Sequence, residues 1–132
     1  MIGIDIISIK RIQAFVEKFG LLGLRRFLRD DEIALCLKQP CNLSDKSFNI
    51  AYLNIARIAG FWAAKEACAK ALGVGIGGEL GFLDIHISKD VRNAPHITLT
   101  DEKMAYFGLS AIGLSISHDS GFAVAAVLCR AF

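Results

Sequence analysis

The stretch from residue 54 to residue 72, NIARIAGFWAAKEACAKAL, constrains the fold more than any other segment because it is the strongest helical signal in the chain. It is rich in alanine and in other good helix formers, although Gly60 weakens the signal slightly. Gly73 follows it directly and is a typical helix end. We therefore expect one long helix over residues 54–72, with a small sheet packed against it.

Apolar alternation and turn residues divide the rest of the chain into shorter elements. A buried strand is expected over residues 2–7, which carry four isoleucines. The other expected elements are helices at 8–19, 31–38 (capped by Asp30) and 101–107, strands at 82–88, 96–99, 113–118 and 122–129, and an irregular link at 39–53. Neighbouring strands would be mostly antiparallel, so the order β-α-α-α-β-β-α-β-β predicts an α+β fold.

The length and hydropathy of the chain set further limits. A chain of 132 residues suits one domain, which we expect to span residues 1–132. The apolar fraction of 54% is high for a small protein, so some apolar surface is expected to be buried between subunits. No run approaches the ~18 apolar residues that cross a bilayer, and no basic region precedes an apolar stretch at the N-terminus. We expect a protein that is neither exported nor membrane-bound.

The four cysteines favour a reducing compartment, hence the cytoplasm. Their spacing is irregular, without a CxxC pair, so it indicates neither a zinc knuckle nor a redox motif (Cys36, Cys41, Cys68 and Cys129). Two of them lie among apolar neighbours, as ordinary core thiols do. A chain of this length does not need disulfides for stability.

Two carboxylates stand in unusual surroundings. Glu66 and Lys70 are four residues apart on an alanine-rich helix, and an exposed ion pair explains them as well as a site does. Asp5 changes this balance, because a lone carboxylate in an isoleucine-rich strand is costly to bury unless it is paired, hydrogen-bonded or metal-bound. Asp5 and Glu66 could meet around Mg²⁺, which takes one or two carboxylates, waters and phosphates. Lys65 and Lys70 would then contact the phosphates.

The other polar features are less specific. The glycine-dense stretch 73–78 follows a helix instead of opening one, which disfavours a Rossmann or P-loop site. Close approach of a bulky ligand and a simple turn explain these glycines equally well. His118 ends a strand beside the turn at residues 119–121, where a surface group is commoner than a ligand contact. No Ser-His-Asp or Cys-His arrangement can be assigned.

Positive charge concentrates between residues 6 and 29. The segment has six basic residues and one acid, Glu17 (the basic residues are Lys10, Arg11, Lys18, Arg25, Arg26 and Arg29). An acidic partner would explain this field, and so would a solvated helical face. Aromatic residues do not interleave with the basic ones, so nothing indicates a nucleic-acid partner.

Taken together, the motifs resemble the holo-acyl-carrier-protein synthase family, the short trimeric type of 4′-phosphopantetheinyl transferase. The matching motifs are GIDI at residues 3–6 with Arg11, AAKEA at 63–67, KALGVGIG at 70–77, Asp84-Ile85 and SISHD at 115–119. This resemblance implies transfer of the 4′-phosphopantetheine group from coenzyme A to a serine of apo acyl carrier protein. The products would be holo acyl carrier protein, used in fatty acid biosynthesis, and adenosine 3′,5′-bisphosphate.

The resemblance also implies residue roles. Asp5 and Glu66 match the Mg²⁺ ligands and, with Lys70 near the diphosphate, form the expected catalytic set. A coenzyme pocket between adjacent subunits of a homotrimer is implied for Lys65, Lys70, Gly73, Gly75, Ile76 and His118. A docking surface for the acidic carrier is implied for Arg11, Arg25, Arg26 and Arg29. The base that takes the serine proton stays open between a metal-activated water, Glu66 and Asp5.

Two positions depart from the family pattern. Phe61 stands where the family usually has arginine, with Arg57 one turn earlier, and Val74 stands where threonine is frequent. Two other kinds of protein fit these residues less well. A metal-dependent phosphoester hydrolase would need more carboxylates than Asp5 and Glu66 supply. A non-catalytic scaffold or coenzyme-binding module would give Asp5 no purpose.

Overall fold

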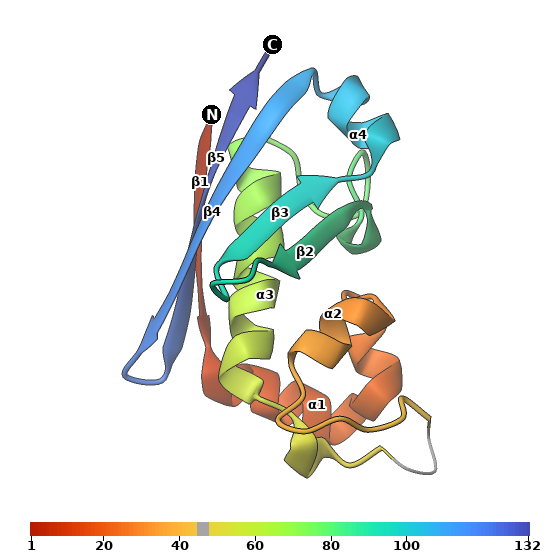
Figure 1. Ribbon diagram of the computed structural model, residues 1–132. Coiled ribbons are helices and arrows are strands. Elements are labelled where there is room, and N and C mark those ends of the chain that lie inside the picture. The colour runs from red at the N-terminus through yellow and green to blue at the C-terminus, as the bar shows by residue number, and fades with distance from the viewer. Residues whose placement is uncertain (45–47) are drawn as a thin grey trace.

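The computed structural model describes residues 1–44 and 48–132 and has an α+β architecture, as predicted. A three-stranded antiparallel sheet has the order β1 (Ile2–Ser8), β5 (Phe122–Ala131) and β4 (Leu109–Asp119), and a second sheet pairs β2 (Ile85–Lys89) with β3 (Pro95–Leu99). The helices are α1 (Ile9–Leu24), α2 (Asp30–Leu35), α3 (Ile55–Ala71) and α4 (Asp101–Tyr106). Figure 1 shows α3 lying along the long sheet, with α1 and α2 at one end of the molecule.

Helix α3 packs directly on β1 and β5 because the residues at the crossing are small. Its buried face includes Ala63, Ala67 and Ala71, and Gly3 of β1 lies against it. A Cβ atom at Gly3 would come within 2.0 Å of the carbonyl oxygen of Ala67, so no larger residue fits there. Asp5 lies two residues further along β1 and therefore on the same, helix-facing side of the strand. The close crossing thus places Asp5 against α3.

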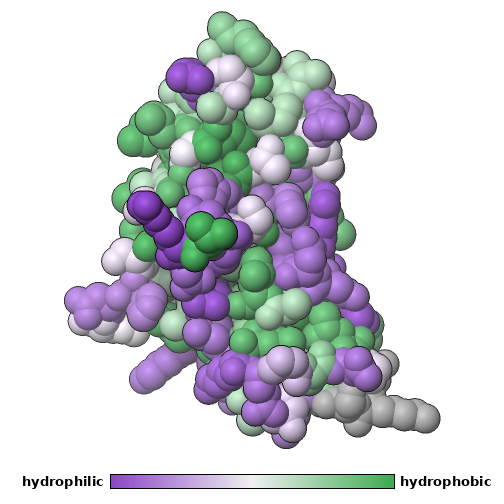
Figure 2. Space-filling view, in the orientation of Figure 1, coloured by the Kyte–Doolittle hydropathy of each residue, from purple (hydrophilic) through white to green (hydrophobic). Residues whose placement is uncertain are grey.

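The opposite face of this sheet is apolar and open. Ile2, Ile4 and Ile6 of β1 are 75%, 62% and 62% exposed, and Leu128 of β5 pairs with Ile2 across the strands. The side chains of β1 alternate, so three of the isoleucines predicted to be buried lie on the outside. Figure 2 shows the molecule in the orientation of Figure 1. Hydrophilic side chains lie across the middle of the visible face, at the level of the β2–β3 turn.

Several element bounds differ from the predictions for local reasons. Helix α1 does not end at Phe19: its backbone leaves helical geometry at Gly20 (φ 58°, ψ −146°) and turns helical again as far as Leu24. Glycine allows this break, because positive φ costs it little. Strand β4 begins at Leu109, earlier than the predicted residue 113, and β2 begins at Ile85 after a 3₁₀ turn (Phe82–Asp84).

The predicted cap of the second helix was also wrong. Arg29, not Asp30, is the N-cap residue, and the Glu32 carboxylate accepts a hydrogen bond of 2.8 Å from the Arg29 backbone N–H. The irregular link predicted at residues 39–53 contains a 3₁₀ turn (Ile50–Tyr52), and its residues 45–47 lie outside the described residues. Within the described parts of the chain, we find no helix that is both long and apolar enough to cross a membrane.

Candidate active site

Asp5 and Lys70 meet where β1 crosses the C-terminal part of α3. The Lys70 Nζ donates to Asp5 Oδ1 at 2.9 Å and to the Ile4 carbonyl oxygen at 3.1 Å. Asp5 is 15% exposed and Lys70 is largely in solvent. The expectation that Asp5 needs a partner is therefore met by an ion pair, which is open to solvent on the lysine side.

Glu66 lies one turn before Lys70 on the same face of α3 and completes an acidic pair with Asp5. Burial raises the pKa of Glu66, and the nearby Asp5 carboxylate raises it further, whereas Lys70 and Arg11 lower it. Arg11 is in the first turn of α1, which follows β1 directly, and the Ser8 hydroxyl accepts its backbone N–H. The two carboxylates thus repel one another at a partly buried place that has cationic residues beside it.

This donor set fits Mg²⁺. A divalent cation between Asp5 and Glu66 would remove the carboxylate repulsion, and hard oxygen ligands suit magnesium. Groups of three or more His, Cys, Asp or Glu side chains placed for a metal are absent from the described residues. The site is therefore not a closed protein cage, and most ligands would be waters and substrate phosphates, as magnesium prefers.

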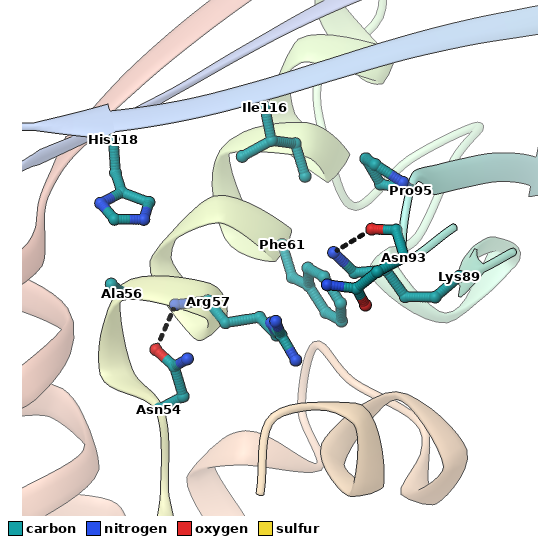
Figure 3. Close-up of a pocket in the computed structure, with 9 residues that line it drawn as sticks. All are labelled: Asn54, Ala56, Arg57, Phe61, Lys89, Asn93, Pro95, Ile116 and His118. Atoms are coloured by element: carbon teal, nitrogen blue, oxygen red, sulfur yellow. Dashed lines mark hydrogen bonds between the residues drawn. The ribbon is translucent and has the colours of Figure 1, made fainter. Parts of the chain in front are cut away.

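A polar pocket of about 250 Å³ opens near the N-terminus of α3 (Figure 3). It is lined by Asn54, Ala56, Arg57, Phe61, Lys89, Asn93, Pro95, Ile116 and His118. His118 projects into it from β4, and the Phe61 ring lies between the Arg57 and Lys89 side chains. Arg57 donates to the Leu35 carbonyl oxygen at 2.9 Å, which holds its guanidinium in place. Phe61 itself is buried in the core, so the cationic side chains give the pocket its character, and they suit an anionic ligand.

The pocket bears on the departure from the family pattern at Phe61, where the family usually has arginine. Arg57 and Phe61 are one turn apart on the same face of α3 and both line the pocket. An arginine is therefore present beside the aromatic residue, although it comes from the preceding turn. Lys89 and Asn93 were missed by the sequence analysis, because residues around the β2–β3 turn carry no motif that singles them out.

The pocket and the acidic pair face different sides of α3. Arg57 and Glu66 are nine residues apart, which is about 2.5 helical turns, so their side chains leave the helix in opposite directions. In the sheet, Asp5 is on β1 and His118 is on β4, with β5 between the two strands. Within one chain the structure therefore does not bring His118 to Asp5 and Glu66.

The predicted glycine segment lies beyond the C-terminal end of α3, close to Lys70 in the chain and away from His118. Gly73 has φ +71°, which favours glycine and ends the helix, and a Cβ at either Gly73 or Gly75 would meet open space. Ile76 is half-buried and forms an isolated bridge with Leu80. Gly73 and Gly75 are exposed, and the predicted coenzyme contacts of all three residues stay a prediction.

Lys65 does not lie where its expected contact with the coenzyme would place it. Its side chain has no exposed surface, and its Nζ donates to Glu32 Oε1 (2.9 Å), the Phe27 carbonyl (2.7 Å) and the Phe82 carbonyl (3.1 Å). Burial lowers the pKa of Lys65, and the Glu32 carboxylate opposes this. Three protons with three acceptors leave none for a phosphate, so the predicted contact of Lys65 with the coenzyme has no support in this geometry.

The four arginines predicted to bind a carrier protein are not equivalent. Arg11 and Arg26 are exposed, and the Arg26 guanidinium lies 5.4 Å from the centre of the Phe19 ring. Arg25 forms an ion pair with Asp30 at 2.9 Å, and Arg29 donates to the Leu83 carbonyl oxygen. Arg11 and Arg26 are therefore the better candidates for a partner's acidic groups.

Comparison with known families identifies the chain. The model of the 4′-phosphopantetheinyl transferase superfamily matches residues 1–127. This protein belongs to that superfamily. A holo-[acyl-carrier-protein] synthase of Helicobacter pylori strain P12 is 52% identical over 128 residues, which cover 97% of this chain and 96% of the relative. A holo-[acyl-carrier-protein] synthase of Wolinella succinogenes is 47% identical over 127 residues, covering 96% of this chain and 94% of the relative.

Solved structures of holo-[acyl-carrier-protein] synthases agree with this family assignment. The crystal structure of Helicobacter pylori holo-[acyl-carrier-protein] synthase in complex with coenzyme A superposes with a TM-score of 0.83 at 52% identity, covering 98% of this chain and all of that chain. The synthase of Bacillus anthracis in complex with CoA (3′,5′-ADP) gives a TM-score of 0.73 at 34% identity and covers 99% of this chain and 96% of that chain. The predicted family and the α+β fold are thus confirmed.

Proposed function

We propose that this transferase moves the 4′-phosphopantetheine group of coenzyme A to a serine of apo acyl carrier protein, in the service of fatty acid biosynthesis. The observation that carries the proposal is the near full-length likeness to the Helicobacter pylori synthase that binds coenzyme A. The products are holo acyl carrier protein and adenosine 3′,5′-bisphosphate. The serine oxygen gives its proton to a base and forms a bond to the β-phosphorus, the bond from that phosphorus to the bridging oxygen breaks, and the bisphosphate leaves with that oxygen.

Asp5 and Glu66 would hold Mg²⁺ in this reaction. The bound ion supplies charge neutralisation for the diphosphate and for the leaving phosphate. Lys70 places a second positive charge beside the same carboxylates, at the point where its ammonium now contacts Asp5. Both carboxylates stand on regular elements, a strand and a helix, so little reorganisation is needed when the diphosphate arrives.

The pocket around Phe61 would take the adenosine bisphosphate half of the coenzyme. Arg57, Lys89 and His118 offer cationic or hydrogen-bonding groups to phosphate oxygens. Because this pocket and the acidic pair face opposite sides of α3, each coenzyme would lie between two subunits. The open apolar face with Ile2, Ile4 and Ile6 supports a subunit interface, and the family resemblance implies that the assembly is a homotrimer.

The acidic carrier would dock on α1 and the segment after it. Arg11 would contribute both to carrier docking and to the acidic pair, because its side chain is exposed on α1 while its charge acts on Glu66.

We further propose that residues 1–132 act as one domain in the cytoplasm, where the free thiols of the four cysteines would persist.

We expect Arg11→Glu to weaken use of the carrier more than binding of coenzyme A. A reversed charge at the docking surface repels an acidic partner, and we expect KM for the carrier to rise about tenfold, or ~1.4 kcal/mol. Steady-state kinetics with each substrate varied in turn measure the difference. Added salt should raise the carrier KM of the unaltered protein, since it screens exposed charges. Equal effects of Arg11→Glu on both substrates would argue against the docking role.

The activity itself is tested with the unaltered protein, coenzyme A, Mg²⁺ and apo acyl carrier protein. Mass spectrometry of the carrier should show the added mass of one phosphopantetheine arm, and a chelator should abolish the gain. Hydrolysis of coenzyme A without change in the carrier would favour a phosphoester hydrolase. Binding of coenzyme A without either product would favour a non-catalytic coenzyme-binding module.

A further inference from the structure

Glu32 and Lys65 are the charged side chains that the described part of the chain buries completely. Neither is part of the acidic pair or of the polar pocket. Two buried charges are costly to desolvate, and apolar residues of similar volume would often give equal or greater stability. The pair therefore calls for an explanation in terms of geometry.

The two side chains join segments that are far apart in the sequence. Glu32 Oε1 accepts from the Arg29 backbone N–H (2.8 Å) and from Lys65 (2.9 Å), while Oε2 accepts from the Ile87 backbone N–H at 2.9 Å. Lys65 Nζ also donates to the carbonyl oxygens of Phe27 and Phe82. Each of these partners is a backbone atom or the other member of the pair, so the network fixes main-chain positions.

One end of this network is helix α3, which carries Glu66, and the other end is the segment of residues 25–29. Lys65 directly precedes Glu66 on α3, with its side chain turned inward while Glu66 turns toward Asp5. The carbonyl oxygen that Lys65 holds belongs to Phe27, and the N–H that Glu32 holds belongs to Arg29. Residues 25–29 are thus attached by hydrogen bonds to the turn of α3 that carries Glu66.

We propose that Glu32 and Lys65 are positioning residues, which set the distance between the carrier-docking segment 25–29 and the acidic pair on α3. This inference rests on the proposed function. A docked carrier must present its serine oxygen to the β-phosphorus of coenzyme A, and a misplacement of about 1 Å can cost on the order of 10²-fold in rate. The pair touches no reacting atom and acts through the backbone it holds.

Glu32→Gln is the variant that tests this role, because it keeps the side-chain shape and one acceptor oxygen but removes the charge that holds Lys65. We expect kcat/KM for the carrier to fall about tenfold or more, in proportion to the lost positioning. The dissociation constant for coenzyme A, measured by calorimetry with Mg²⁺, should stay within about twofold, since the pocket and the acidic pair are not touched. Amide hydrogen exchange should quicken at Arg29 and Ile87, which lose a charged acceptor.

Leu109→Ala is the matched control for stability. Leu109 is buried at the start of β4, away from the pair, so its truncation lowers the melting temperature without touching segment 25–29. Its carrier kinetics should equal those of the unaltered protein when both are assayed well below their melting temperatures. If Glu32→Gln does not fold, Lys65→Arg keeps the charge in an altered shape and is expected to show the same selective loss.

The outcomes separate this inference from the proposed function. Absence of transfer by the unaltered protein would overturn the proposed function itself. Transfer by the unaltered protein with undiminished carrier kinetics in Glu32→Gln and Lys65→Arg would overturn the positioning role alone. An equal loss of coenzyme affinity, or the same carrier defect in Leu109→Ala, would also overturn it, because the effect would then be general.

Discussion

Replacing Glu66 with glutamine is expected to lower kcat/KM by about 10²–10³-fold while the protein stays folded. The change removes one of two carboxylates that would hold Mg²⁺, and with it the charge placed to stabilise the leaving phosphate. Stability should not suffer, because burial and Asp5 both disfavour the ionised form of Glu66, as its raised pKa indicates. Asp5→Asn should give a similar loss of rate and in addition frees Lys70 from its ion pair.

Three measurements check this prediction. Transfer to the carrier gives the rate, calorimetric titration with Mg²⁺ gives ion binding in the presence of coenzyme A, and circular dichroism shows whether the fold is kept. Glu102→Gln on α4 is the matched control, since it changes an exposed carboxylate in the same chemical way. Unaltered Mg²⁺ affinity and turnover in both Glu66→Gln and Asp5→Asn would rule out the proposed metal ligands.

The long helix was predictable because its signals are local. Residues 55–71 form α3 as expected from alanine content, and Gly73 takes the positive φ of a helix end. The environment of β1 was harder to predict. Four isoleucines in seven residues look like a buried strand, yet Ile2, Ile4 and Ile6 lie on the open face. The sequence shows that a side chain is apolar but not which chain will cover it.

The candidate site was predictable in part. Asp5, Glu66 and Lys70 come together in the structure. This was predictable because the family motifs mark all three residues and because residues four apart share a helix face. Lys65 is adjacent to Glu66 but about 100° away around the helix, and it is buried with Glu32. Glu32 was missed because two of its partners, Lys65 and Ile87, come from distant segments, which only the folded chain brings together. Adjacency in the sequence to a proposed metal ligand therefore says little about a role at the site.

Introducing a charge on the open face of the sheet is expected to separate the subunits. The acidic pair of one subunit would then be parted from the pocket of the next. Ile4→Arg would place an unpaired charge in the proposed trimer interface, which costs about 2–5 kcal/mol, or at least ~30-fold in association. Sedimentation should show single chains, and activity should fall with the trimer population. Val91→Arg is the control, because Val91 is fully exposed at the β2–β3 turn. A fully active single chain would contradict the shared site.

Mixing two inactive variants tests the shared site more directly. Glu66→Gln spoils the acidic pair and Arg57→Ala spoils the pocket, and these residues face opposite sides of α3. If each coenzyme lies between two subunits, trimers assembled at random from equal amounts contain sites with both halves intact. About one quarter of the unaltered activity should return, because half of the acidic pairs and half of the pockets are intact. If both halves belonged to one chain, no chain in the mixture would be complete and no activity would return.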